Sequence, residues 1–498
     1  MDQIQILTQE INKAISGNTT YNTYRPIWRY LLESYVGGEE YRRAQHLVRY
    51  QLESDAEYVA RLRTTPLQNH CQSVISVYTS FLFRQEPNRE FGSLEMAIEL
   101  DDFLEDADFE GRSFNAFMKE ASAWSSVFGH CWVVMAKANI GAQNRAEELA
   151  QEVRPYVALL TPMVVLDWRY GKRANGSYEL IYFKYTEDVN GDVTVIKEWE
   201  KETVRTRTIN TKDLMILEDI VEANGLGKIP AVCVYNKRGV QRGIGVSDIA
   251  DIADAQRFIY NATSEIDQSI RLDSHPSLVK TPDTQAGVGA GAIIHMPENL
   301  DSGLKPYVLE FTGANVQNIL QVINSTIESV DKMANTGAVR ATEARILSGV
   351  AMQTEFQLLN ARISEKAAAM ELAEEQLWEL FCEYQGYQWE GEIKYERDYN
   401  LKDEHTEIDK LVKAKSAATD ARVTQLIDHE LIELLGQDAD IVMPETVTLP
   451  NGQTVPLDSA EPFDEPEKLF NPSTGETGWV IDFASKREAM LNGWVEKE

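Results

Sequence analysis

The chain has 498 residues, 43% hydrophobic and 26% charged, which is typical of a folded protein with several packed regions and excludes wholesale disorder. Its formal net charge of −31 excludes tight adhesive binding to nucleic acid, and is compatible with a surface that repels polyanions or with solubility alone. No stretch approaches the roughly 18 apolar residues of a membrane span and the start lacks a signal-peptide pattern, so we expect a cytoplasmic chain without membrane insertion.

The first part of the chain has the residue spacing of broken helices. Ser54 and Glu57 are spaced as in a capping box, which predicts a helix start. A further helix is predicted over about 67–87, and a third helical region over about 96–127. The short apolar run 130–135 then predicts a buried strand.

Strand-like patterns replace the helical ones over residues 155–235. Asn175-Gly176 and Asn190-Gly191 are typical hairpin turns between alternating runs, so we expect a β-rich subdomain. A glycine-rich connection follows at 238–245. It lacks the GxxxxGK[ST] signature of a phosphate-binding loop, which favours a hinge-like turn that leads to Ser247-Asp248 as a helix N-cap.

A long helix is predicted over residues 247–273, about 40 Å in length. Positions spaced alternately three and four apart form a narrow seam along it: Ile249, Ile252, Gln256, Ile259, Thr263, Ile266 and Ile270. His275-Pro276 ends this helix. The Gly- and Pro-containing insert that follows, to residue 313, is predicted to be a small β-containing excursion.

A second helix, 314–334, repeats this design with two different faces. One face is apolar and contains Val316, Ile319, Ile323, Ile327 and Val330. The other has mainly neutral amides and hydroxyls where a solvated helix usually has Lys and Glu: Asn315, Asn318, Gln321, Asn324, Ser325 and Glu328. An ordinary surface helix is the alternative interpretation.

Residues 335–350 break the helical pattern and are predicted to be a loop containing Arg340 and Arg345. A very long helix is expected over 351–384, and another helical region over about 404–435. The remainder is acidic, with a last helical segment expected near 485–494.

Catalytic and cofactor motifs are missing. His429 to Glu433 lacks the second histidine of a zinc-protease helix, and Gly287 to Gly291 lacks GxGxxG spacing. Two dipeptides, His70-Cys71 and His130-Cys131, could offer four metal ligands, but each lies beside an apolar run that favours core packing. We expect no enzyme activity, metal or cofactor. We also expect four reduced, buried cysteines without a disulfide: Cys71, Cys131, Cys233 and Cys382.

The order of these elements resembles the portal proteins of tailed double-stranded DNA phages. In that order a helical and β-rich first half is followed by a long helix, an excursion, a second long helix, a loop and a very long helix. Short local similarities support it: residues 58–69, 83–87, 154–156, 245–249, His275-Pro276 and Ser348-Gly349. The resemblance implies an α+β, mainly α, portal fold.

The resemblance also implies the regions of that fold. They would be a wing at 1–246, a first stem helix at 247–273, a small α/β clip at 274–313, a second stem helix at 314–334, a tunnel loop at 335–350, a long helix returning to the wing at 351–400, and a crown with a C-terminal tail at 401–498.

Site residues are expected from the resemblance together with the helix faces. DNA-channel contacts would be Arg340, Arg345, Thr342, Asn318, Gln321, Asn324 and Ser325. Contacts between subunits in the stem would be Ile252, Ile259, Ile266, Ile319, Ile323 and Val330. Clip docking residues would be Gln285, Gly287, Gly289 and Gly291. A structural alternative for both arginines is pairing with Glu343 or with a neighbouring subunit.

A portal of this family would be a homo-oligomeric ring, by resemblance a dodecamer, at one vertex of the virion capsid, made in the host cytoplasm. Its implied partners are double-stranded DNA, a large terminase that hydrolyses ATP, a head-tail adaptor, and the major capsid and scaffold proteins. Another phage head-tail joining or structural virion protein, or an enzyme of unrecognised type, is the alternative.

Overall fold

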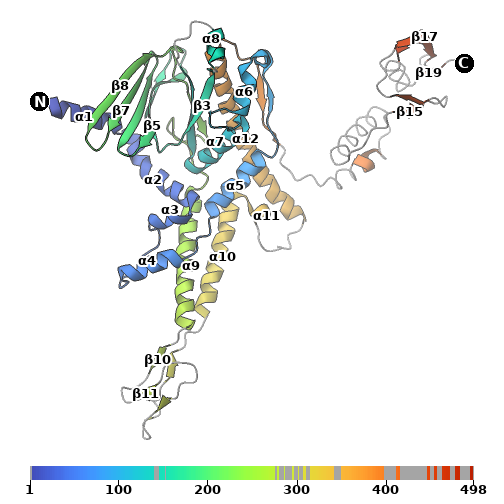
Figure 1. Ribbon diagram of the computed structural model, residues 1–498. Helices are drawn as coiled ribbons and strands as arrows, with labels where there is room; N and C mark the ends of the chain where they lie inside the picture. Colours follow the sequence, from blue (N-terminus) through green and yellow to red (C-terminus); the bar gives the residue numbers. More distant parts are fainter. Residues whose placement is uncertain are drawn as a thin grey trace. The chain divides into compact units, whose positions relative to one another are not determined.

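The computed structural model describes residues 3–138, 145–151, 153–274, 277–279, 285–286, 294–295, 301, 307–309, 314–340, 349–397, 411–415, 446–448, 454–456, 462–470, 477–482 and 494–496. The chain forms two compact units, Met1–Asn400 and Leu401–Glu498 (Figure 1). Helices and strands are both present and helix predominates in the first unit, as expected for an α+β protein that is mainly α.

The first unit opens with five helices, α1 to α5: Gln3–Ile15, Thr19–Val36, Gly38–Arg43, Asp55–Thr64 and His70–Leu82. The capping box is confirmed at the start of α4. The Glu57 amide N–H donates to Ser54 Oγ at 3.3 Å, and the Ser54 amide N–H donates to Glu57 Oε2 at 2.9 Å. The helix predicted over 67–87 is α5, which ends five residues earlier.

The helical region predicted over about 96–127 is interrupted. It follows a 3-10 turn, η1 (Gly92–Met96), and consists of two helices, α6 (Glu99–Glu105) and α7 (Phe114–Phe128). The loop between α6 and α7 is stabilised by its own carboxylates, because Asp106 accepts from the amide of Gly111 and Asp108 from that of Glu110, both at 2.9 Å. Such local side-chain bonds compete with helix formation.

A small antiparallel sheet forms the centre of the first unit. Its strand order is β3 (Pro155–Leu160), β2 (His130–Lys137), β9 (Ala231–Tyr235). The central strand β2 includes the predicted run 130–135, and all six of those residues are buried. α7 packs on this sheet, and α12 (Gly349–Gln385) packs on it as well. The short α8 (Arg145–Ala150) lies between β2 and β3 in sequence, and β1 (Asn88–Glu90) pairs with β14 (Glu392–Lys394).

A second, five-stranded sheet is an antiparallel meander, β4 to β8: Val165–Lys172, Tyr178–Asn190, Val193–Glu200, Thr203–Asn210 and Met215–Ala223. The two predicted hairpin turns are found here, with Gly176 and Gly191 at φ values of +87° and +60°.

The glycine-rich connection 238–245 is a tight turn, with Arg238 and Gly245 paired across it. A Cβ on Gly245 would lie 1.8 Å from the carbonyl oxygen of Gly129, so only glycine allows the two segments to cross here. α9 begins at Ala250, three residues after the predicted Ser247. The Ser247 hydroxyl donates to the carbonyl of Val127 at 2.6 Å and accepts from the Ile249 amide at 3.1 Å, just before the helix.

Two long helices, α9 (Ala250–Ser274) and α10 (Ala314–Ala334), pack along each other and point away from the sheets (Figure 1). Between them, β10 (Ser277–Val279) pairs with β13 (Tyr307–Leu309), and β11 (Gln285–Ala286) pairs with β12 (Ile294–His295). The region predicted as a loop, 335–350, contains a one-turn helix, α11 (Gly337–Arg340), and the first turn of α12 starts at Gly349. A loop throughout is therefore wrong.

The second unit contains five short described strands, β15 to β19: Thr446–Thr448, Thr454–Pro456, Pro462–Phe470, Thr477–Asp482 and Val495–Glu496. β15 pairs with β16, and β17 lies between β18 and β19. The helices predicted at 404–435 and 485–494 lie mostly outside the described residues, although 411–415 is helical.

All four cysteines are free. Three are buried, and Cys233 is half-buried. Burial raises the pKa of Cys71 to about 12, which keeps the thiol protonated. His130 is fully buried, and burial lowers the pKa of its imidazole to about 3.

In the described part of the chain, no group of three or more His, Cys, Asp and Glu side chains is arranged to hold a metal ion. No helix there has the length and hydropathy needed to cross a membrane.

Candidate functional site

Buried polar contacts fix α9 against the N-terminal helices. The Gln256 amide is fully buried, donates to the carbonyl of Ser34 at 2.9 Å and accepts from the backbone N–H of Cys71 at 3.0 Å. Nearer the C-terminal end of α9, Ser264 Oγ accepts a hydrogen bond from Arg61 of α4 at 3.1 Å. Arg61 also forms an ion pair with Glu53 at 2.7 Å. α9 is therefore a fixed support for α10.

The apolar seam of α9 and α10 is largely closed within one chain. Ile252, Ile259, Ile323 and Val330 are each at most 4% exposed in the isolated chain. Ile266 and Ile319 are half-buried. The prediction that the first four contact a neighbouring subunit is corrected, because they pack inside a single chain. Two helices of one chain that pack along each other can bury each other's apolar faces without a partner.

The neutral face of α10 is exposed as the sequence predicted. The side chains on it that were expected to contact DNA are all solvent-accessible: Asn318, Gln321, Asn324 and Ser325. Hydroxyls on this helix bond back to its own carbonyls, for example Ser329 to Ser325 at 2.9 Å. The face presents hydrogen-bonding groups with little charge, which can contact water or phosphate without strong Coulomb attraction.

Arg340, at the end of α11, is buried in an intramolecular cluster. Its Nη1 lies 2.8 Å from Asp331 Oδ1, its Nη2 lies 2.8 Å from His70 Nδ1, and its side chain is only 10% exposed. This is the structural alternative foreseen for the arginine, with Asp331 as partner rather than Glu343. Its assignment as a DNA contact is corrected. Arg345 and Thr342 lie outside the described residues.

His70 is neutral in this cluster. Burial, together with the positive charge of Arg340, lowers the pKa of the imidazole to about 4. An unprotonated Nδ1 can accept the guanidinium N–H, whereas a protonated ring could not. Nearby, the Tyr78 hydroxyl donates to the carbonyl of Ala334 at 2.5 Å. The C-terminus of α10 and the whole of α11 are thus fastened to α5.

A second buried cluster joins α12 to the start of α9, and sequence reasoning missed it. Lys366 donates to Ser126 Oγ at 2.8 Å and also contacts Asn236 and Asp248. Arg362 adds a 2.9 Å ion pair to Asp248. Burial would raise the pKa of Asp248, but the two cations outweigh it and lower that pKa. The sequence feature that could have indicated this cluster is Lys366 itself, a lysine on the apolar face of a long predicted helix.

The predicted docking residues of the insert are only partly described. Gln285 lies in β11, paired with His295 of β12. Gly287, Gly289 and Gly291 lie outside the described residues, so their predicted role is untested.

The chain was compared with protein families, curated proteins and solved structures. Comparison with curated proteins finds no relative. Among solved structures, the neck of an empty GTA particle computed with C6 symmetry is 12% identical with a TM-score of 0.43, covering 79% of this chain and 99% of the other. The virion of a native gene transfer agent (GTA) particle is 13% identical with a TM-score of 0.40, covering 78% and 97%.

The neck of a native GTA particle computed with C12 symmetry is 13% identical with a TM-score of 0.39, covering 80% of this chain and 98% of the other. The sequence itself matches the family described as phage portal protein, SPP1 Gp6-like, over residues 34–427. That match spans most of the chain and includes both long helices and the elements on either side of them. The chain therefore belongs to the SPP1 Gp6-like family of phage portal proteins.

Proposed function

We propose that this protein is a non-enzymatic ring subunit that forms the DNA channel at one capsid vertex during genome packaging and ejection. The observation that carries this is the exposed neutral face of α10 in a chain of net charge −31. Such a surface stays hydrated and hydrogen-bonds weakly, so a polyanion passes without being held. The family membership supports the same role.

The regions are assigned on this proposal. α9 and α10 form the stem, 274–313 the clip, 335–350 the tunnel loop, 1–246 and 351–400 the wing, and 401–498 the crown. The ring is a dodecamer in the virion, assembled in the host cytoplasm with the major capsid and scaffold proteins. Asn318, Gln321, Asn324 and Ser325 line the channel, and Arg345 with Thr342 contacts DNA from the tunnel loop.

The clip is the proposed docking site for the large terminase and later for the head-tail adaptor. A deletion within 285–291 should leave ring assembly intact, because α9 and α10 pack without it. It should lower binding of both partners in a pull-down. Unchanged binding of both would contradict this docking site.

A charge added to the α10 face tests the channel. Gln321→Lys should slow packaging in a reconstituted system with prohead and terminase, and the slowing should lessen at higher salt, because a ring of lysines attracts phosphate. Gln151→Lys makes the same chemical change at an exposed position before β3 and serves as the control. Equal packaging rates for the two variants would mean that this face does not line the channel.

A further inference from the structure

The turn between β9 and α9 presents an exposed basic segment, here called the basic loop, residues 237–242. Lys237, Arg238 and Arg242 are exposed, no carboxylate interrupts them, and Val240 at the tip is fully exposed. The loop is held in shape, because the Gly243 amide donates to the Tyr235 hydroxyl at 2.7 Å and the Gly239 amide to the carbonyl of Ile244 at 3.0 Å. A fixed basic projection is unexpected in so acidic a chain.

Both arginines of the basic loop are oriented by aromatic rings. The Arg242 guanidinium carbon lies 3.6 Å from the centre of the Tyr178 ring, and that of Arg238 lies 5.4 Å from Tyr235. Within the described residues neither arginine has a carboxylate partner. Stacking leaves the guanidinium N–H groups free to bind an anionic surface, while limiting side-chain freedom in advance.

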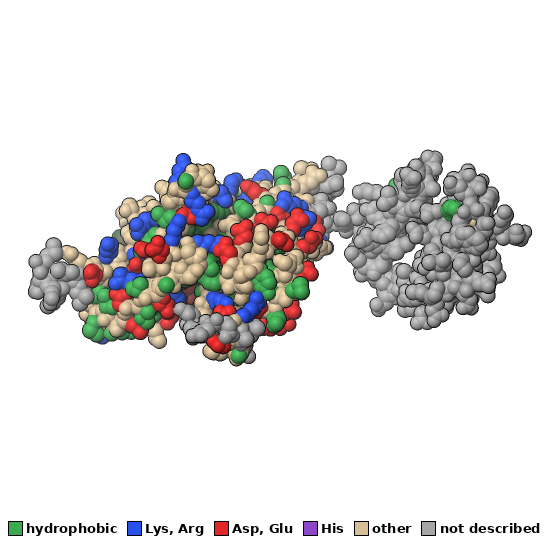
Figure 2. Space-filling model, turned by 90° about the horizontal axis from the view of Figure 1, so that it is seen from above, with side chains coloured by type: hydrophobic (Ala, Val, Ile, Leu, Met, Phe, Trp, Pro, Cys, Tyr) green, Lys and Arg blue, Asp and Glu red, His purple; other side chains and the backbone are tan. Residues whose placement is uncertain are grey.

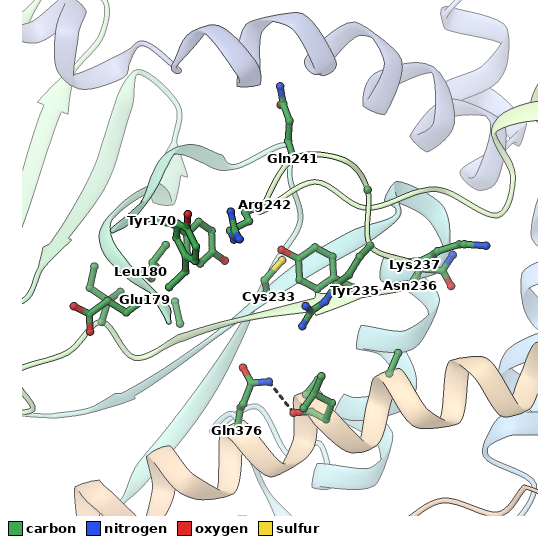
Figure 3. A pocket seen from close by; sticks show the side chains of 18 of the residues that line it. Tyr170, Glu179, Leu180, Cys233, Tyr235, Asn236, Lys237, Gln241, Arg242 and Gln376 are labelled. Carbon is green, nitrogen blue, oxygen red and sulfur yellow. Dashed lines mark hydrogen bonds between the residues drawn. The ribbon is translucent and has the colours of Figure 1, made fainter. Parts of the chain in front are cut away.

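A groove of about 890 Å³ lies behind the basic loop, between the edge of the meander and α12. Figure 3 shows Gln241 and Arg242 on one side of it, Gln376 of α12 on the other, and Tyr170 and Tyr235 between them. Exposed Leu372 of α12 also lines the groove. Lys237 lies 4.0 Å from Glu365 of α12, whereas Arg238 and Arg242 have no such partner in the described part of the chain. The surface thus combines two unpaired arginines with apolar side chains, which is the composition of a protein docking surface.

A complementary surface lies on α6 and the turn after it, residues 101–110, here called the acidic loop. Asp101, Asp102 and Glu105 are exposed and have no ion pair in the described part of the chain. At its tip Phe109 is 52% exposed, with a φ of +62°, which is uncommon for a bulky residue. Arg154 stacks on that ring at 4.1 Å, and the Tyr156 ring lies 5.5 Å from it, so two neighbours hold the half-exposed Phe109 in place.

The two loops lie at opposite edges of one sheet. The acidic loop borders β3, whose Val157 amide donates to the carbonyl of Ala107 at 3.0 Å. The basic loop follows directly from β9, and β2 separates β3 from β9. Figure 2 shows basic and acidic side chains interspersed over the described face of the first unit, with no division into one acidic and one basic side. Opposite, complementary surfaces are what a head-to-tail ring contact requires.

We propose that the basic loop of one copy docks on the acidic loop of the next copy, and that this contact closes the ring. The inference rests on the proposed function, which requires a ring. Copies that each carry −31 repel one another, so assembly needs local pairing of opposite charge to orient the encounter. Val240 and Phe109 supply the apolar contact at its centre.

Charge reversal tests the pairing. The first variant is Arg238→Glu with Arg242→Glu, and the second is Asp101→Arg with Asp102→Arg. Each alone should raise the concentration needed for rings at least tenfold, measured by native mass spectrometry and sedimentation, because like charges then face each other. Circular dichroism should show that both fold, since all four side chains are exposed. The control for the first variant is Arg25→Glu with Arg63→Glu, which makes the same change of charge at two exposed arginines outside both loops.

The decisive experiment mixes the two charge-reversed variants. Each reversed loop then meets an opposite charge on the other variant, so alternating rings should form, and all four changes in one chain should also restore rings. Rings from either variant alone at the wild-type concentration would overturn the proposal, as would no recovery on mixing folded variants. Failure of the wild-type chain to form rings would instead overturn the proposed function.

Discussion

At the scale of single residues, buried polar contacts join positions that are far apart in the chain. Arg340 was predicted to be a DNA contact in a loop, but its position between Asp331 and His70 depends on α5, which lies about 270 positions earlier in the chain. Lys366 was overlooked for the same reason, since its partner Asp248 is 118 residues away. Long-range polar contacts leave no periodic signal in a sequence.

The ion pair between Arg340 and Asp331 should show strong coupling. Asp331→Asn leaves a mostly buried guanidinium without its counter-charge, so the free energy of unfolding should fall by about 3 kcal/mol. Arg340→Gln in that background should cost much less than it does in the wild type. Denaturant unfolding of the single and double variants measures this, and additive losses would contradict the pairing.

His70 should make stability depend on pH. Its pKa is about 4 in the folded chain and about 6.5 when unfolded, so below pH 6.5 the unfolded state binds the proton more readily. The stabilisation is therefore complete above pH 6.5 and is lost as pH falls toward 4, by about 3 kcal/mol at most. His70→Asn should flatten that slope in unfolding experiments between pH 7.5 and 5. An unchanged slope would show that His70 does not titrate as inferred.

At the scale of elements, α10 was predicted with its bounds, and α9 and α12 to within three residues, because their apolar seams repeat at helical spacing over many turns. The helical region expected at about 96–127 is interrupted where Asp106 and Asp108 accept hydrogen bonds from the backbone of their own loop. A seam also gives no information about whether its partner belongs to the same chain, which is why Ile323 was assigned to a subunit contact.

Two neighbouring positions on α10 test which face of the helix packs inside the chain, because Ile323 is buried and Val322 is exposed. Ile323→Ala should lower the free energy of unfolding by about 2–5 kcal/mol, because Ile323 is 4% exposed. Val322→Ala, at a position 49% exposed, should change it by less than about 1 kcal/mol. Thermal or urea unfolding of both variants is the measurement. Equal effects would mean that α10 is rotated relative to the described packing.

At the scale of the whole molecule, the order of elements predicted the family that the sequence match shows. Composition contributed the idea of a non-adhesive surface, since −31 and an amide-rich face point in the same direction. The proposed contact between the basic and acidic loops, 237–242 and 101–110, could not be predicted from the sequence, because both are short, lack periodicity and come to border one sheet only after folding.

Electron microscopy of the purified full-length chain tests the central claim most directly. The account predicts closed rings of uniform size with a central hole wide enough for double-stranded DNA, with α9 and α10 around the hole and α10 facing it. Particles that remain single copies at micromolar concentration in every salt condition, or closed assemblies without a hole, would contradict it.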